Sequence, residues 1–204
     1  MLKIDTLALG NYQTNCYILR HDASNTCVLI DPGCEAAYIL EKVRSFGLTV
    51  EAILLTHGHF DHVLAVAQIA EETGCDLWMH PGDHHPENAH MASFFYPLSA
   101  QKLSRVHYCD EGDTIEAAGL KIRVLFTPGH TQGSVCYRCE NALFTGDTLF
   151  AGSCGRTDLP GGSYQTIQAS LARLASLEEN YAIYPGHGES STLLRERQQN
   201  PYLR

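Results

Sequence analysis

Three histidines and one aspartate fall within the seven residues THGHFDH, at positions 56–62. His57 and His59 stand two positions apart and share an orientation in an extended loop, while Gly58 lets the chain turn tightly between them. Asp61 and His62 open the next helical pattern and point back toward the same place. Imidazole and carboxylate together suit zinc, manganese or iron better than calcium or magnesium, which favour oxygen ligands. With 11 histidines in 204 residues, chance would give HxHxDH in roughly one such chain in a thousand, which favours a metal site over scattered surface histidines.

Five apolar runs each end in a Thr, Pro or Gly step that delivers a residue able to bind a metal. They are VLIDPG, AILLTHGHFDH, VLFTPGH, ALFTGD and AIYPGH. Their continuous hydrophobicity is typical of buried strands, and layered α/β proteins bind ligands beyond the carboxyl ends of such strands. We therefore expect one common rim, formed by Asp31, His57, His59, Asp61, His62, His130, Asp147 and His187.

Seven of these residues exceed what one metal ion needs, because a tetrahedral zinc ion uses at most four ligands. Two divalent ions sharing one carboxylate would use all seven and leave a bridging position for water. We assign His57, His59 and His130 to the first ion and Asp61, His62 and His187 to the second, with Asp147 bridging. Zinc is the expected metal, and iron and manganese also suit these ligands.

Other polar residues near these motifs have two interpretations each. Asp31 is either a turn residue before Pro32 and Gly33 or a carboxylate that fixes a ligand imidazole. The segment 80–97 holds four further histidines and is expected to be a long loop with solvated side chains, an accessory metal site or a lid contact being the alternative.

Strands and helices must alternate along the chain to position this rim. Strand-like runs occur at about 2–8, 14–20, 26–30, 51–55, 76–79, 120–126, 134–138, 142–145 and 181–184, and helical patterns at about 35–46, 62–73, 164–177 and 190–199. This interleaving predicts an α/β layered fold, with Asp61 and Ser163 as helix N-caps. No linker interrupts the 204 residues, so one domain spanning 1–204 is expected.

Composition excludes some partners. The net charge of −9 argues against nucleic acid and against an anionic membrane surface. The sequence shows no signal peptide and no apolar run long enough to span a membrane, so the cytoplasm is the expected location. Most of the eight cysteines are expected to be small core residues, and disulfides are not expected; the CxxC of Cys136 and Cys139 lies inside a strand-like run.

These motifs resemble the metallo-β-lactamase superfamily over nearly the entire chain, which implies a four-layer αβ/βα sandwich with a two-metal site. THGHFDH, TPGHTQGS, FTGDTLF, GRTDLPGGS, YPGHG and the ending ERQQNPYL look most like the short glyoxalase II-type (hydroxyacylglutathione hydrolase-like) hydrolases. The seven metal ligands of that family fall on the seven positions assigned above. True metallo-β-lactamases usually have a cysteine where Asp147 stands, which disfavours lactam cleavage.

The resemblance implies hydrolysis of a small thioester such as S-D-lactoylglutathione by a metal-bridging hydroxide, with Asp61 as the catalytic residue that orients it. Arg156 stands where the family often has a lysine near glutathione, but Asp158 replaces its tyrosine. The chain is also expected to lack the family's extra C-terminal glutathione-binding region. Arg156 therefore either binds substrate or pairs internally with Asp158.

Two other functions remain as alternatives. The stretch SCGRTD also resembles the persulfide dioxygenases, which would place one iron on His57, His130 and Asp147 and leave the second position empty. A regulatory module that responds to metals or thiols would use the cysteines, but no basic patch or DNA-binding helix pair supports it. Two metals per chain with anaerobic hydrolysis would favour the hydrolase, and one iron with oxygen consumption the dioxygenase.

Overall fold

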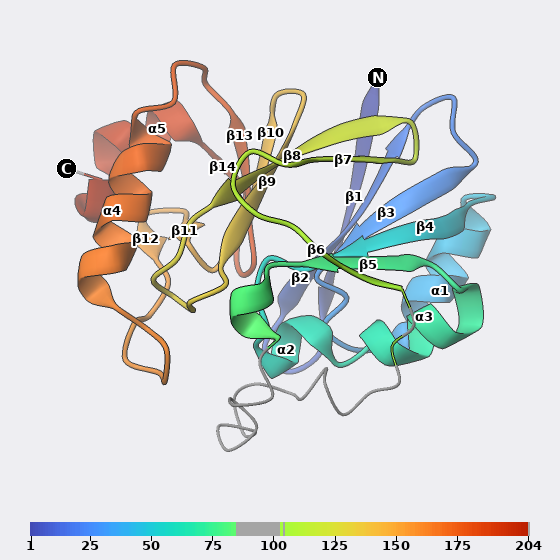
Figure 1. Cartoon of the computed structure of the whole chain (residues 1–204). Helices are drawn as coiled ribbons and strands as arrows, with labels where there is room; N and C mark the ends of the chain where they lie inside the picture. Colours follow the sequence, from blue (N-terminus) through green and yellow to red (C-terminus); the bar gives the residue numbers. More distant parts are fainter. Residues whose placement is uncertain (85–102, 104, 204) are drawn as a thin grey trace.

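The computed structural model describes residues 1–84, 103 and 105–203, in which two six-stranded sheets face each other with helices on the outside (Figure 1). The expected single unit of 1–204 therefore includes a stretch, with His85 and His90, that lies outside the described residues. Among the described residues, no helix combines the length and apolar character needed to cross a bilayer.

The first sheet has the order β1-β2-β3-β4-β5-β6 and comes from the N-terminal part of the chain. Its strands are β1 (Leu2–Leu9), β2 (Thr14–His21), β3 (Thr26–Ile30), β4 (Thr49–Leu54), β5 (Asp76–Met79) and β6 (Val106–Tyr108). β3 to β6 run parallel to one another, so the carboxyl ends of β3 and β4 lie at the same edge. The helical segments of this part are α1 (Ala36–Ser45), α2 (Phe60–Val63), α3 (Val66–Thr73) and η1 (Pro81–Asp83).

The second sheet has the order β14-β13-β10-β9-β8-β7. Its strands are β7 (Thr114–Ala117), β8 (Leu120–Phe126), β9 (Val135–Cys139), β10 (Ala142–Gly146), β13 (Ala182–Pro185) and β14 (Ser191–Thr192). β10 and β13 are parallel and deliver their following residues to one edge. The remaining elements are the hairpin β11 (Leu149–Phe150) and β12 (Ser153–Cys154), the helices α4 (Tyr164–Ala175) and α5 (Leu193–Gln199), and η4 (Pro201–Leu203).

Alternate strand residues fill separate apolar layers, since successive side chains of a strand point to opposite faces. On β2, Cys16 and Ile18 pack in the layer that contains α1 and α3, whereas Tyr17 and Leu19 pack between the two sheets. A third layer lies between the second sheet and α4. The chain is therefore the predicted four-layer αβ/βα sandwich.

Two buried tyrosines connect the sheets across the central layer in opposite directions. The Tyr17 hydroxyl, on the first sheet, donates to the carbonyl of Pro185 on the second at 2.5 Å. The Tyr137 hydroxyl, on the second sheet, donates to the carbonyl of Leu55, just after β4, at 2.8 Å. Both carbonyls stand two residues before a histidine of the rim, so the bonds fix the sheets together beside it.

Local details differ from the sequence prediction at the helix that begins near Asp61. The expected helix 62–73 is divided into α2 and α3, and the predicted Asp61 N-cap is wrong: His59 occupies that position without a side-chain cap. The Asp61 carboxylate instead accepts a hydrogen bond from the Thr14 hydroxyl. The N-cap prediction for Ser163 is confirmed, because its hydroxyl accepts from the Thr166 amide at 3.2 Å.

All eight cysteines are free thiols, as expected. Cys136 packs under α4, whereas Cys139 packs between the sheets. The two thiols of the CxxC therefore face opposite sides of β9 and do not form a pair.

Candidate metal centre

The strand ends that the sequence singled out meet at one edge of the sandwich (Figure 1). Asp31 follows β3, His57 follows β4, His130 follows β8, Asp147 follows β10 and His187 follows β13. The side chains come from both sheets, so the rim lies where the two sheets meet.

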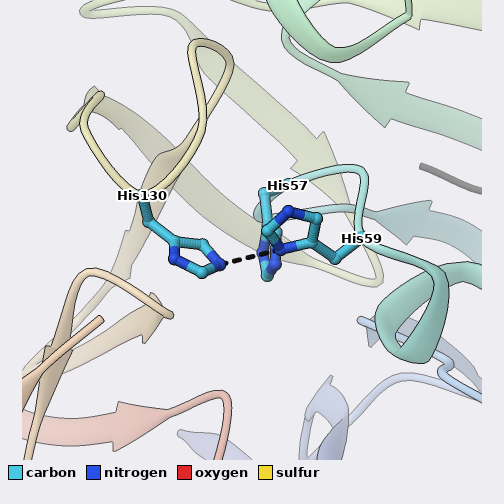
Figure 2. Close-up of side chains that lie close together, drawn as sticks. All are labelled: His57, His59 and His130. Carbon is cyan, nitrogen blue, oxygen red and sulfur yellow. Dashed lines mark hydrogen bonds between the residues drawn. The ribbon is translucent and has the colours of Figure 1, made fainter. Parts of the chain in front are cut away.

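Three histidines form the first donor group, His57, His59 and His130, whose ligand atoms lie within 4.8 Å of one another. Figure 2 shows His57 and His59 on the loop between β4 and α2, with His130 directed toward them from the loop after β8. His130 Nε2 lies 2.8 Å from His59 Nδ1. All three side chains are buried.

Asp61, His62 and His187 form the second donor group, with the same 4.8 Å limit. Asp61 and His62 lie on α2, and His187 arrives from the far end of the chain. His187 Nε2 lies 3.2 Å from Asp61 Oδ2 and 3.3 Å from His62 Nε2.

Asp147 lies between the two donor groups. Its Oδ2 is 3.5 Å from His130 Nε2 in the first group and 3.6 Å from His187 Nε2 in the second. Its Oδ1 is 3.5 Å from His62 Nε2 and is buried without a hydrogen-bond partner among the described residues. This is the position that a bridging carboxylate would occupy.

Glycine is required where the chain passes this carboxylate. A Cβ atom at Gly186 would lie 2.2 Å from Asp147 Oδ1 and 2.8 Å from His62 Cε1. The first glycine of YPGHG thus allows His187 to reach the rim.

Hydrogen bonds orient four of the imidazoles. His62 Nδ1 lies 3.0 Å from Asp31 Oδ2, His130 Nδ1 2.8 Å from the Arg156 carbonyl, and His187 Nδ1 3.1 Å from the Tyr12 carbonyl. His57 Nδ1 lies 3.1 Å from Thr56 Oγ1, whose own hydrogen is donated to Asp31 Oδ2. A neutral imidazole has one N–H, so these acceptors assign it to Nδ1 and leave the lone pair on Nε2.

The remaining lone pairs converge, which tests whether the site fits a metal. His57 Nε2 is buried without a hydrogen-bond partner in the described part of the chain. His62 Nε2 and His187 Nε2 face each other at 3.3 Å, where two lone pairs repel unless a cation or a proton lies between them. The donor set of imidazoles and carboxylates fits divalent zinc, iron or manganese.

The pKa values of the titratable side chains differ between the two donor groups. Burial lowers the pKa of His57 well below its ordinary value and that of His59 to about 3, so both are neutral donors. Burial also disfavours charge on His62, but the carboxylates of Asp147 and Asp31 outweigh it and raise its pKa to about 9. The pKa of Asp61 is lowered in spite of burial, because His187 and His62 stabilise its carboxylate. The second group therefore attracts positive charge.

Asp31 combines both roles that the sequence left open. Its backbone is left-handed, with φ of 50°, at the turn after β3. Its buried carboxylate accepts from the Thr56 amide at 2.7 Å and contacts His62 Nδ1.

Sequence reasoning missed Asp83, a buried residue of η1. Its carboxylate accepts from the Gly58 amide at 2.8 Å, the Thr131 hydroxyl at 2.7 Å and the Gly133 amide at 2.8 Å. Asp83 thus ties the loop of His57 and His59 to that of His130. The sequence HPGDHH contains turn residues but no spacing that would reveal this contact.

A cavity of about 520 Å³ opens beside the rim. Its apolar wall includes Tyr12, Phe60, Phe150 and Leu159, and Asp61, His130, Asp147 and His187 reach into it. Arg156 also lines the cavity, and its guanidinium forms a two-point ion pair with Asp158, with both N–O distances at 2.7 Å. The internal pairing is thus observed, and substrate binding by Arg156 stays a prediction.

Comparisons with known proteins cover nearly the whole chain. The family model described as "Metallo-beta-lactamase superfamily" matches residues 9–187. Hydroxyacylglutathione hydrolase GloC of Haemophilus influenzae is 31% identical over 214 residues, which cover 99% of this chain and 98% of that protein.

Two solved structures have the same fold as this chain and are more than 30% identical to it in sequence. BLEG-1, described as a B3 metallo-beta-lactamase, is 32% identical with a TM-score of 0.83, covering 100% of this chain and 99% of that one. TTHA1623, in a di-iron-bound form, is 36% identical with a TM-score of 0.82, covering 98% and 100%. Each match therefore includes all the strand ends that form the rim.

Proposed function

Because this chain belongs to the metallo-beta-lactamase superfamily, a superfamily of metal-dependent hydrolases, we propose that it cleaves a small thioester, such as S-D-lactoylglutathione. The observation that carries the proposal is the pair of complete donor groups with Asp147 between them. The similarity to hydroxyacylglutathione hydrolase GloC supports the thioester. The free thiols fit a reducing compartment, so we infer the cytoplasm as the place of action.

Two divalent cations would be held by the groups already described. His57, His59 and His130 would hold one, and Asp61, His62 and His187 the other, with Asp147 shared. Bound there, the cations would supply a Lewis acid and make hydroxide available at neutral pH. Zinc is the proposed metal, and the di-iron form of TTHA1623 keeps iron as a second choice.

The residues of this chain would orient the reacting groups. Asp61, held by the Thr14 hydroxyl at 3.0 Å, would accept a hydrogen bond from the attacking water and direct its lone pair at the carbonyl carbon. The apolar wall would hold the arms of the thioester and limit access of other water. The leaving thiolate has a pKa of about 8.5, so it departs without a dedicated acid.

β-Lactam hydrolysis is a second candidate, favoured by the similarity to BLEG-1. Cleavage of a lactam amide releases an amine nitrogen, which needs a proton, whereas a thiolate does not. A chromogenic cephalosporin assayed beside a thioester panel would separate the two activities.

The persulfide dioxygenase alternative uses fewer of these donors, and the similarity to ETHE1 from Myxococcus xanthus, which is 28% identical with a TM-score of 0.82, also fits it. It requires one iron on His57, His130 and Asp147, whereas the second donor group is as close-set as the first. Two metals per chain, measured by elemental analysis, and hydrolysis without oxygen would exclude it.

The shared position of Asp147 can be tested by replacing it with asparagine. Asp147→Asn keeps the shape of the side chain but removes the charge between the two groups, so we expect loss of about one metal per chain and at least a hundredfold fall in kcat. Metal content and thioester hydrolysis are the measurements. Asp22→Asn is the matched control, because Asp22 is an exposed carboxylate beside the N-terminus. An Asp147→Asn protein with full metal content and full activity would refute the shared role.

A further inference from the structure

One arginine that lines the cavity beside the rim forms an ion pair with a neighbouring aspartate. Of the described residues that line it, Arg156 is the one lysine or arginine. The Arg156 Nε and Nη2 atoms both donate to the Asp158 carboxylate, at 2.7 Å each. These two atoms form one of the two faces with which a guanidinium binds a carboxylate in a bidentate fashion.

Asp158 therefore occupies one bidentate face of the guanidinium and compensates its charge. Both side chains are exposed, with 60% of Arg156 and 67% of Asp158 accessible, so the pair is at the entrance to the cavity and not in the core. A substrate carboxylate entering here would meet a neutralised cation, and it would have to bind beside Asp158 or displace it. An uncharged arm has no such competition.

The position of Arg156 is fixed close to the rim. Its backbone carbonyl accepts the hydrogen bond from His130 Nδ1 at 2.8 Å. Arg156, which lines the cavity, thus also orients an imidazole of the first donor group. The pair with Asp158 consequently lies at the edge of the space where a substrate bound at the rim would extend.

The walls of the cavity match an uncharged arm. The aromatic rings of Tyr12 and Phe60 meet edge to face with centroids 5.2 Å apart. Phe150 and Leu159 complete the apolar surface. Burial of an apolar group against an apolar surface is favourable, whereas such a surface offers a carboxylate no hydrogen bond.

We propose that Asp158 is a specificity-determining residue that neutralises Arg156, so that the cavity selects thioesters whose arms carry no carboxylate. This inference rests on the proposed function and narrows it. Glutathione thioesters carry carboxylates, so S-D-lactoylglutathione would be hydrolysed, but with a lower kcat/KM than a neutral thioester with the same acyl group.

Binding of two thioethers that cannot be hydrolysed tests the role of Asp158 without turnover. The probes are S-hexylglutathione, which is anionic, and N-acetyl-S-hexylcysteamine, which is neutral. In Asp158→Asn, titration calorimetry should show about fivefold tighter binding of the anionic probe at low ionic strength, with the neutral probe unchanged. The gain should shrink at high salt and disappear when Arg156→Ala is added. Glu116→Gln is the matched control, since it breaks an exposed pair with Lys121 on the hairpin of β7 and β8.

Hydrolysis tests the substrate class. We expect a higher kcat/KM for S-acetyl-N-acetylcysteamine than for S-acetylglutathione, and Asp158→Asn should lower KM for the glutathione ester at unchanged kcat. A wild-type preference for the glutathione ester, or an Asp158→Asn protein with no gain for either anionic compound, would overturn the inference. If metal-loaded protein hydrolyses neither ester, the proposed function fails, while the calorimetry still decides whether Asp158 sets the charge preference.

Discussion

At the scale of single residues, Asp31 shows how one carboxylate shapes both the turn and the metal centre. The motif VLIDPG placed Asp31 at the end of a strand, and β3 does end at Ile30. Its left-handed backbone, with φ of 50°, turns the chain, while its carboxylate contacts Thr56 and His62. The sequence could locate this residue but could not choose between the two roles, because the choice depended on where His62 would lie.

Replacement of Asp31 by asparagine should weaken metal binding. The asparagine NH₂ group would replace Asp31 Oδ2, which contacts Thr56 Oγ1 and His62 Nδ1. The His62 ring would then lose the acceptor that orients it. We expect a tenfold to hundredfold rise in the metal dissociation constant, roughly the range known for such partners. Competition with a chromophoric chelator measures it. Asp76→Asn is the control, since Asp76 binds Arg105 and His107 on the first sheet; equal affinity in both variants would count against this role.

Two residues show the limits of sequence reasoning at this scale. Asp61 was expected to lie beside His187, as it does, but also to cap a helix, whereas its carboxylate accepts a hydrogen bond from Thr14, which is far away along the chain. Asp83 joins two loops that are distant in sequence. Local spacing contains no information about either contact.

At the scale of elements, the C-terminal helix supports the hairpin that lines the cavity. Asn200, which follows α5, donates to the carbonyls of Phe150 at 3.3 Å and Ser153 at 2.9 Å. The buried Glu196 accepts from the Gly152 amide at 2.7 Å. The ending ERQQNPYL thus holds β11 and β12 in place.

Asn200→Ala should loosen this hairpin. The Phe150 and Ser153 carbonyls would lose a buried donor, which costs about 1–3 kcal/mol of stability. Because Phe150 lines the cavity, KM should rise more than kcat falls. Thermal unfolding and steady-state kinetics are the measurements, with the exposed Gln199→Ala as control. An unchanged KM in a destabilised Asn200→Ala protein would show that the hairpin does not contact substrate.

The strands that the sequence predicted are those with long apolar runs. All five runs that end at the rim form strands, because burial on both faces requires continuous hydrophobicity. Five strands were missed: β11, β12 and β14 have two residues each, β6 has three and β7 has four. Such short strands depend on packing against neighbours and leave no periodic pattern to read.

At the scale of the whole molecule, the candidate metal centre lies where the two sheets meet. Each donor group takes residues from both: the first adds His130 to the loop after β4, and the second adds His187 to α2. The hydroxyls of Tyr17 and Tyr137 form hydrogen bonds between the two sheets beside these donors. Bound cations would therefore stabilise the contact between the sheets.

Removal of metal should lower the thermal stability of the protein. A ligand that binds only the folded state at a hundred times its dissociation constant adds about 2.7 kcal/mol. We expect a dialysed, chelator-treated sample to melt several degrees below one reloaded with zinc. Asp147→Asn should gain less from zinc than the native protein. Identical melting curves with and without metal would contradict a centre that joins the sheets.

The spread of these donors along the chain also sets an order during synthesis. His57, His59 and His130 are all synthesised before His187. The residues of the first donor group are therefore all present in a growing polypeptide before those of the second, because the second group needs His187 in addition to Asp61 and His62. Loading with cations would then proceed in two stages, the last of them only after translation has passed residue 187.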